Sequence, residues 1–288
     1  MNLFEKRKTP VVGQIGDYLH YCEFVKRLTE QSLRTKRIII TRFVRDTDIT
    51  DFQKLTNAKL NDWHSQLVKE GKVGKTVNNY QETIVTCLKY LGRHGYKLKF
   101  DFDMVERAHE EQRESTWFTP AQIEMIKAAC IGPKELLVIS FLFDSLLRIS
   151  ELRMLRVEDI SGATVKVIQG KGRKDRTTFI GEDTEKLLRR WLTLNDISTG
   201  YIFPSPDRFG QPLTVTAIRA AITPPIRRAG FDKGSAHSLR HSKATDIRNK
   251  GGDIVFVQSV LGHSDIKTTR RYVHVTEEQL RQEYHQFA

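Results

Sequence analysis

Hydrophobic side chains recur every three to four residues through the first third of the chain, which is the spacing of one face of an α-helix. Such stripes cover residues 60–68, just before Gly71, and residues 77–91, just before Gly92. An earlier stripe over residues 33–43 alternates with arginines and lysines, which suits either a solvated face or a phosphate-binding face. The pattern predicts a small helical domain over residues 1–100.

The helical periodicity fades after this region and returns near residue 117. Residues 101–116 are dense in charge, which favours an inter-domain linker. Thr119 then precedes Pro120, and Gln122 follows, a sequence that predicts a helix start with a threonine N-cap and a capping box. We therefore expect a second domain over residues 117–288.

The second domain shows mostly helical patterns, with one β signal among them. An apolar run at residues 136–143 predicts a buried helix. Two β-branched runs flank a glycine-rich basic tip and predict a hairpin, at residues 164–168 and 176–180. Further helices are expected at residues 184–194, 214–229, 238–249 and 253–262. The predicted fold class is mainly α with a small β-hairpin or sheet (α+β).

The charge balance favours a polyanionic partner. The 288 residues include 47 Lys and Arg against 35 Asp and Glu, which gives a net charge of +12 and a pI near 9.6. Excess positive charge speeds encounter with polyanions, so nucleic acid is the leading partner class. A basic protein that is merely soluble has the same totals, so charge sets an expectation and decides nothing.

The cysteines and the apolar runs narrow the cellular setting. Cys22, Cys87 and Cys130 lie far apart with no C-x-x-C pair, which disfavours a zinc knuckle or a disulfide framework and suits a reducing compartment. The first ten residues lack the apolar region of a signal peptide, and the run at residues 136–143 is too short to span a bilayer. We expect a cytoplasmic protein with no membrane partner.

Several residues could serve either structure or chemistry. Arg148 follows the apolar run and could pair with Glu151 or present its guanidinium to a phosphate. Lys171 lies at the glycine-flanked hairpin tip, as a solvated turn residue or as a mobile cation that donates a proton. His237 and Arg240 share one face at a helix start, where anions are favoured, although Arg240 could equally be a surface arginine.

Each residue further along also allows two interpretations, of which the structural one is the more common for a lone histidine or tyrosine. His241 is adjacent to Arg240 and is expected to point elsewhere. His263 follows Gly262 at a helix end, as a cap or as a catalyst, and Tyr272 is either a packing residue or a nucleophile. A zinc site could be considered for four histidines, namely His237, His241, His263 and His274. It is rejected, because no cysteine or carboxylate ligand has useful spacing and because arginines beside His237 and His241 would repel a cation.

Five short motifs in order change the weight of these alternatives. They are Leu147-Arg148-Ile149-Ser150-Glu151-Leu152, Gly170-Lys171-Gly172 followed by Lys174 and Arg176, His237-Ser238-Leu239-Arg240-His241-Ser242, Leu261-Gly262-His263, and Thr268-Thr269 before Tyr272. With these motifs the chain resembles the tyrosine recombinase (λ-integrase-like) family, most closely its short Xer-type members, and the resemblance covers nearly the whole chain in domain plan. One departure is Leu146, where many members carry glycine. We expect leucine to exclude the positive φ that glycine can adopt there.

The resemblance implies a site-specific DNA recombinase that cleaves and rejoins strands through a 3′-phosphotyrosyl intermediate, without ATP, metal or another cofactor. Tyr272 would be the nucleophile, His237 would accept its proton, and Lys171 would protonate the departing 5′-oxygen. Glu151 would orient Arg148 or a neighbouring histidine. The implied catalytic residues are Arg148, Lys171, His237, Arg240, His263 and Tyr272.

The resemblance also implies partners. A helical core-binding domain and a catalytic domain would close around a double-stranded recombination site as a C-shaped clamp. The protein would be a homotetramer on DNA through exchange of its C-terminal helix, and a dimer or monomer when free. Candidate DNA contacts are Arg34, Arg37, Arg42, Lys75, Arg173, Lys174, Arg176, His241 and Arg270. A type IB-like topoisomerase and a catalytically silent DNA-binding protein of the same fold are the alternatives.

Overall fold

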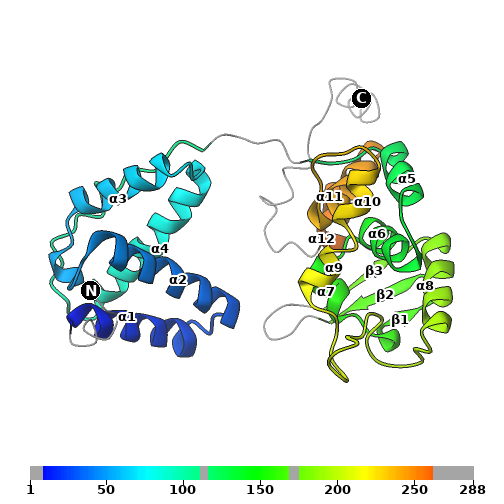
Figure 1. The fold of residues 1–288 in the computed structure, drawn as a ribbon, viewed down its shortest axis with the longest axis horizontal. Helices are drawn as coiled ribbons and strands as arrows, with labels where there is room; N and C mark the ends of the chain where they lie inside the picture. Colours follow the sequence, from blue (N-terminus) through cyan, green and yellow to red (C-terminus); the bar gives the residue numbers. More distant parts are fainter. Residues whose placement is uncertain (1–8, 111–115, 169–174, 262–288) are drawn as a thin grey trace. The chain divides into compact units, whose positions relative to one another are not determined.

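The computed structural model describes residues 9–110, 116–168 and 175–261, in two compact units (Figure 1). The first unit spans Met1–Arg113 and the second Glu114–Ala288. Each unit encloses its own hydrophobic core, as independently packed domains do.

The N-terminal unit is helical. Its elements are α1 (Pro10–His20), a π-helical turn (Tyr21–Val25), α2 (Glu30–Thr47), a 3-10 turn (Phe52–Lys54), α3 (Asn57–Lys69) and α4 (Gly74–Arg93). Thr29 and Thr56 accept hydrogen bonds from backbone N–H groups in the first turns of α2 and α3. The three predicted stripes lie on α2, α3 and α4. Their apolar faces meet around Phe43 and Trp63, whose ring centroids are 4.8 Å apart.

The chain after α4 packs back against that helix. Phe100 is buried in the N-terminal core. Asn78 of α4 donates to the carbonyl oxygen of Ala108 at 3.0 Å and accepts from the N–H of the same residue at 2.7 Å. Gln81 donates to the carbonyl oxygen of Glu106 at 2.8 Å. Residues 101–110, which the sequence predicted as part of a linker, are therefore held against the N-terminal unit by their own backbone groups.

The C-terminal unit combines helices with a small sheet. The predicted capping box is present, with reciprocal hydrogen bonds between Thr119 and Gln122. The apolar run at residues 136–143 lies in α6 (Pro133–Ser145), which packs against α8 (Glu182–Leu194) and α11 (Ala236–Asn249). The helices are α5 (Pro120–Ala128), α6 (Pro133–Ser145), α7 (Ile149–Met154), α8 (Glu182–Leu194), α9 (Val215–Arg219), α10 (Thr223–Arg228), α11 (Ala236–Asn249) and α12 (Ile254–Leu261).

The sheet has three antiparallel strands in the order β1 (Ile160–Ser161), β2 (Thr164–Val167) and β3 (Arg176–Phe179). Val165 is paired with Thr178 in the β2–β3 hairpin, and both are fully buried, so this face covers the core. The predicted hairpin strands are confirmed, and the basic tip at residues 169–174 lies outside the described residues. The predicted fold class, mainly helical with a small sheet, is also confirmed.

The single helix predicted over residues 214–229 is wrong. The structure has two short helices there, α9 and α10, separated by residues 220–222. Pro224 and Pro225 lie in the first turn of α10, where no N–H group is needed for a helical hydrogen bond. One continuous helix would place both prolines in its interior, where each would remove a hydrogen bond.

The longest helix in the described ranges is long enough to cross a bilayer but carries charged residues. α4 has 20 residues, but it includes Lys75, Lys89 and Arg93. Within the described ranges, no helix combines the length and the apolar character needed to cross a bilayer.

Candidate active site

The turn between α6 and α7 is built around Leu146. Its backbone is left-handed, with φ 52° and ψ 25°, so the expectation that leucine excludes positive φ at this position is wrong. A left-handed conformation costs a residue with a β-carbon about 1–2 kcal/mol. The Leu146 side chain lies in a buried cluster with Ala244, Val257 and Leu261, and burying a leucine contributes about 1.5–3 kcal/mol. Packing therefore offsets the backbone strain.

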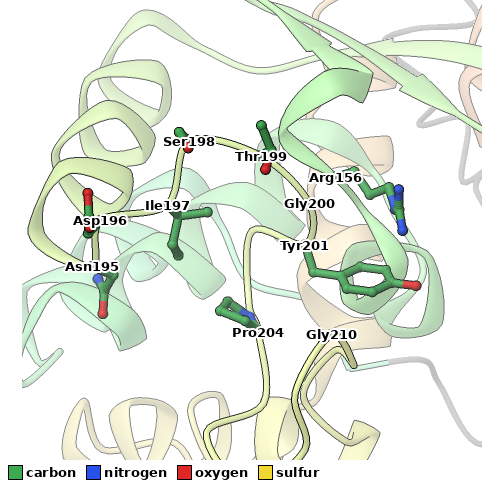
Figure 2. Close-up of a pocket in the computed structure, with 10 residues that line it drawn as sticks. All are labelled: Arg156, Asn195, Asp196, Ile197, Ser198, Thr199, Gly200, Tyr201, Pro204 and Gly210. Carbon is green, nitrogen blue, oxygen red and sulfur yellow. The ribbon is translucent and has the colours of Figure 1, made fainter.

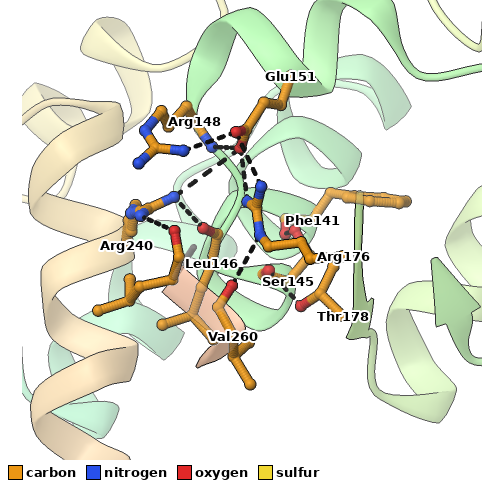
Figure 3. A network of polar contacts seen from close by, with 10 residues as sticks. Phe141, Ser145, Leu146, Arg148, Glu151, Arg176, Thr178, Arg240 and Val260 are labelled. Carbon is orange, nitrogen blue, oxygen red and sulfur yellow. Dashed lines mark hydrogen bonds and ion pairs between the residues drawn. The ribbon is translucent and has the colours of Figure 1, made fainter. Parts of the chain in front are cut away.

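Three other elements hold this turn by hydrogen bonds (Figure 3). Oγ1 of Thr178 on β3 donates to the last carbonyl oxygen of α6 at 2.6 Å. The Leu146 carbonyl oxygen accepts from Nη1 of Arg240 on α11. The Arg148 N–H donates to Oε2 of Glu151 on α7 at 2.7 Å. The turn is thus tied to the sheet, to α11 and to α7.

Arg148 forms a local ion pair at the start of α7. Its Nη1 lies 2.8 Å from Oε1 of Glu151, the carboxylate that also accepts its backbone N–H. The Arg148 side chain is 33% exposed, so an anion from solvent can approach the guanidinium. The two alternatives raised by the sequence are therefore compatible: the ion pair is present, and it orients a side chain that is accessible to a phosphate.

Arg240 lies on α11 and is buried in the protein, with a side chain that is 3% exposed. It is therefore not the surface arginine that the sequence also allowed. Its Nη1 donates to the carbonyl oxygen of Leu146, and its Nη2 donates to that of Leu261, the last residue of α12, at 2.7 Å. Nη1 also lies 3.9 Å from Oε2 of Glu151. A buried guanidinium needs such partners, and they set its orientation.

Arg176, the first residue of β3, is a second arginine bonded directly to Glu151. Nη1 and Nη2 of Arg176 lie 3.0 and 2.7 Å from Oε1 and Oε2 of Glu151, while Nε donates to the carbonyl oxygen of Val260 at 2.9 Å. The sequence predicted Arg176 as a DNA contact. The structure instead places it in the interior, with an exposed fraction of 7%.

These contacts determine the charge of Glu151. Burial acts to raise the pKa of this carboxyl. The hydrogen bond from Arg176, together with the backbone N–H and guanidinium of Arg148, outweighs burial and holds the pKa at about 2, against an ordinary value of 4.5. Glu151 is therefore ionised at neutral pH. Three guanidinium groups, those of Arg148, Arg176 and Arg240, surround this one carboxylate, so the four residues carry a net charge of +2. That excess favours binding of an anion such as phosphate.

Two histidines lie one turn apart at the start of α11. The side chain of Ser235 accepts from the N–H of Ser238 and begins the helix, which places His237 in the first turn. His237 is exposed and His241 is buried, and their rings are parallel with centroids 6.5 Å apart. His241, predicted as a DNA contact, is thus an interior residue, whereas His237 is accessible.

The other predicted site residues fall into two groups. Arg34 and Arg37 on α2 and Lys75 on α4 are exposed, whereas Arg42 is paired with two carboxylates, those of Asp46 and Glu70. The remaining predicted catalytic residues and DNA contacts lie outside the described residues, namely Lys171, Arg173, Lys174, His263, Arg270 and Tyr272.

Two hollows are lined by other residues than Glu151 and the three arginines around it, Arg148, Arg176 and Arg240, which together form the arginine cluster. The first, of about 400 Å³, lies in the loop region after α8, where the Arg156 guanidinium sits over the Tyr201 ring at 4.8 Å from its centroid (Figure 2). The second, of about 550 Å³, lies between α5, α6 and the start of α8. Neither is lined by a described catalytic candidate. In the parts of the chain described by the structure, no group of three or more His, Cys, Asp or Glu is placed to hold a metal ion.

Comparisons with known proteins agree with the geometry. Residues 116–279 match the phage integrase family. The chain is 26% identical over 290 residues to the tyrosine recombinase XerD of Staphylococcus haemolyticus (strain JCSC1435), covering 95% of this chain and 97% of that protein. It is also 26% identical over 284 residues to the tyrosine recombinase XerC of Listeria monocytogenes serovar 1/2a (strain ATCC BAA-679 / EGD-e), covering 94% and 95%.

A solved structure shares the fold. The Tn1549 transposon integrase, in complex with a circular intermediate DNA, aligns with a TM-score of 0.77 and 17% identity over 96% of this chain and 99% of that one. The segment that matches the family spans more than half of this chain and contains the whole arginine cluster. The chain belongs to the phage integrase family, whose tyrosine recombinases are enzymes that break and rejoin DNA.

Proposed function

We propose that this protein is a site-specific recombinase that cleaves and rejoins DNA through a 3′-phosphotyrosyl intermediate on Tyr272, without ATP or metal. The observation that carries the proposal is the convergence of Arg148 and Arg240 on one ionised carboxylate, Glu151, in a cluster with excess positive charge. A phosphodiester is an anion whose oxygens suit guanidinium donors.

Arg148 and Arg240 form the phosphate clamp of this mechanism. Their guanidinium groups bind the non-bridging oxygens and neutralise the charge that develops in the transition state. Glu151 holds Arg148 before DNA arrives, and the carbonyl oxygens of Leu146 and Leu261 hold Arg240. Donors that are already oriented need little reorganisation during the reaction, so they contribute to its rate. In this mechanism the arginines neutralise the charge that metal ions neutralise in other phosphoryl-transfer enzymes.

The covalent step exchanges one phosphate ester for another. The hydroxyl oxygen of Tyr272 bonds to phosphorus as the bond from phosphorus to the 5′-oxygen breaks. His237, accessible on the first turn of α11, accepts the phenolic proton, and Lys171 gives a proton to the departing 5′-oxygen. His263 adds a hydrogen bond to the phosphate. The products are a 3′-phosphotyrosyl protein and a free 5′-hydroxyl.

Rejoining reverses these bonds on a new strand. The 5′-hydroxyl of that strand attacks the phosphotyrosine, which restores the phosphodiester and releases Tyr272. The energy of the original ester is kept in the protein–DNA bond, so ATP is not needed. The roles of Lys171, His263 and Tyr272 rest on the motifs in which they occur.

DNA is the proposed partner of both units. Exposed Arg34 and Arg37 on α2, together with Lys75 on α4, supply phosphate contacts from the N-terminal unit. On DNA we propose a homotetramer joined by exchange of the C-terminal helix. In the sequence of that segment Leu280, Tyr284 and Phe287 are spaced as on one face of a helix.

A suicide substrate tests the proposed function. A duplex site is selected by the protein from a random-sequence library, nicked beside the cleavage position, and incubated with the full chain in EDTA. We expect a covalent protein–DNA adduct that is absent for Tyr272→Phe. An adduct that survives this substitution would identify a different nucleophile, and an adduct that requires a divalent cation would contradict the metal-free mechanism.

A further inference from the structure

We infer that Arg176 is a positioning residue for strand cleavage: it orients Arg148 through Glu151 and joins that pair to the end of α12. The inference deepens the proposed function and rests on it. The sequence suggested only that Arg176 is one more phosphate contact beside the basic hairpin tip.

The side chain of Arg176 makes contacts in two directions (Figure 3). On one side, Nη1 and Nη2 meet both oxygens of Glu151, at 3.0 and 2.7 Å, in the fork geometry that only arginine provides. On the other side, Nε donates to the carbonyl oxygen of Val260 at 2.9 Å. One side chain therefore connects α7, which carries Glu151, to the last turn of α12.

Arg176 fixes which part of Glu151 remains for Arg148. The carboxylate receives the fork of Arg176 on both oxygens, while Oε1 also accepts Nη1 of Arg148, at 2.8 Å, and Oε2 accepts the Arg148 N–H. A carboxylate that can rotate would leave the guanidinium of Arg148 without a fixed direction. The Arg176 fork removes that rotation, so the partly exposed guanidinium of Arg148 keeps one orientation.

The second contact concerns the chain that leads toward the proposed nucleophile. Val260 and Leu261 are the last two residues of α12, and their carbonyl oxygens accept from Arg176 and Arg240 respectively. Cationic donors at a helix C-terminus satisfy its unpaired carbonyl groups and stabilise it. His263 follows only two residues after Leu261 in the sequence. The two arginines thus connect the phosphate clamp to the start of the segment that carries His263 and Tyr272.

The internal partners of Arg176 separate this role from direct DNA binding. All three of its guanidinium nitrogens are bonded within the protein, Nη1 and Nη2 to Glu151 and Nε to the carbonyl oxygen of Val260. A DNA contact made by Arg176 would be visible in the salt dependence of binding, because each phosphate neutralised by a cation releases counterions. A positioning residue changes the rate of the chemical step and leaves that salt dependence unchanged.

The chain offers a matched control in Arg228. Its Nε donates to the carbonyl oxygen of Ala129, the C-cap residue directly after α5, at 2.8 Å, and its Nη2 is paired with Glu135. Arg228 therefore makes the same two kinds of bond in the same unit, outside the arginine cluster. Arg228→Met therefore removes a carbonyl hydrogen bond and an ion pair without affecting the clamp.

The experiment compares Arg176→Met, Arg176→Lys and Arg228→Met with the wild-type full chain on the nicked suicide substrate at saturating DNA. For Arg176→Met we expect the rate of adduct formation to fall by about 100-fold, the size of effect that a small misplacement of a reacting group produces. Its final adduct yield, its DNA affinity and the salt slope of binding should stay at wild-type values. Lysine keeps the charge but lacks the fork, so Arg176→Lys should recover only part of the rate. Arg228→Met should cleave at the wild-type rate.

Each other outcome overturns the inference in a recognisable way. A lower adduct yield at an unchanged rate would show that Arg176 only keeps molecules folded. A salt slope reduced by about one would show a DNA contact. A 5′-bridging phosphorothioate, whose leaving group needs no proton, should not restore the Arg176→Met rate, and rescue would assign Arg176 to the leaving-group side. If the wild-type protein itself forms no Tyr272-dependent adduct, the proposed function fails, and that result is distinct from all of these.

Discussion

The carbonyl oxygen of Leu146 points at Arg240 because Leu146 has a left-handed backbone. The residue follows α6 with φ 52°, and its carbonyl accepts a hydrogen bond from Nη1 of Arg240. The same residue inserts its side chain among Ala244, Val257 and Leu261 of α11 and α12. One strained position thus orients an arginine of the proposed phosphate clamp with its backbone and packs against two helices with its side chain.

At Leu146 a glycine variant should be more stable than an alanine variant, which is the reverse of the order usual in a helix. Leu146→Ala and Leu146→Gly both lose the buried side chain, so each should lower the free energy of unfolding by about 2–5 kcal/mol. Glycine has no β-carbon to oppose a positive φ, so Leu146→Gly should be more stable than Leu146→Ala by about 1 kcal/mol. Chemical denaturation of the two variants measures the difference.

Leu142 provides the control, because it is fully buried in the interior of α6 with an ordinary helical backbone. There glycine should be less stable than alanine by about 1 kcal/mol. The same order of stability at both positions would contradict a left-handed Leu146.

Acid should weaken the clamp through Glu151. The pKa of Glu151 is about 2 in the folded protein against an ordinary value of 4.5, so the folded state favours the ionised form. A depressed pKa contributes stability above pH 4.5 that is lost as the pH falls toward 2. The contribution is on the order of 3 kcal/mol. The stability difference between wild type and Glu151→Gln, measured by denaturant unfolding at several pH values, should shrink through this window. A difference that stays constant from pH 6 to pH 2.5 would contradict the depressed pKa.

Lys171→Ala should slow cleavage by about 100- to 10,000-fold, because the departing 5′-oxygen would lose its proposed general acid. A 5′-bridging phosphorothioate should restore the rate, since a thiolate leaves without protonation. Lys174→Ala, a change in the same predicted hairpin tip, is the control and should show no such rescue. Equal rates for Lys171→Ala on the two substrates would remove Lys171 from this role.

The arginines of α2 should differ in their effect on DNA binding. Arg34 and Arg37 are exposed, so alanine at either position should reduce the slope of log affinity against log salt by about 0.9. Arg42 is paired with Asp46 and Glu70, so Arg42→Ala should leave the slope unchanged. Titrations at several salt concentrations measure these slopes. A larger change for Arg42 than for Arg37 would mean that DNA displaces the two carboxylates.

Local signals in the sequence were enough for most of the secondary structure. The stripe over residues 77–91, the capping box at Thr119 and the strands around the hairpin tip depend on near neighbours, and all are present. The two prolines at residues 224 and 225 also carried a local signal, which a single helix over residues 214–229 ignored. The order and spacing of the five motifs were enough to identify the family.

Only the tertiary structure decided how the site is held. The sequence placed Arg148 near Glu151, three residues away. Nothing local shows that Arg176 binds the same carboxylate, which lies 25 residues away in the sequence, or the carbonyl oxygen of Val260, which lies 84 residues away. The burial of Arg240 and the left-handed backbone of Leu146 likewise depend on α11 and α12 packing over the turn. The sequence by itself determined which chemical groups the protein carries, because residue type and spacing specify chemistry. Long-range packing determined which of those groups can meet a phosphate and which hold the others in place, because orientation and burial arise only when distant segments come together.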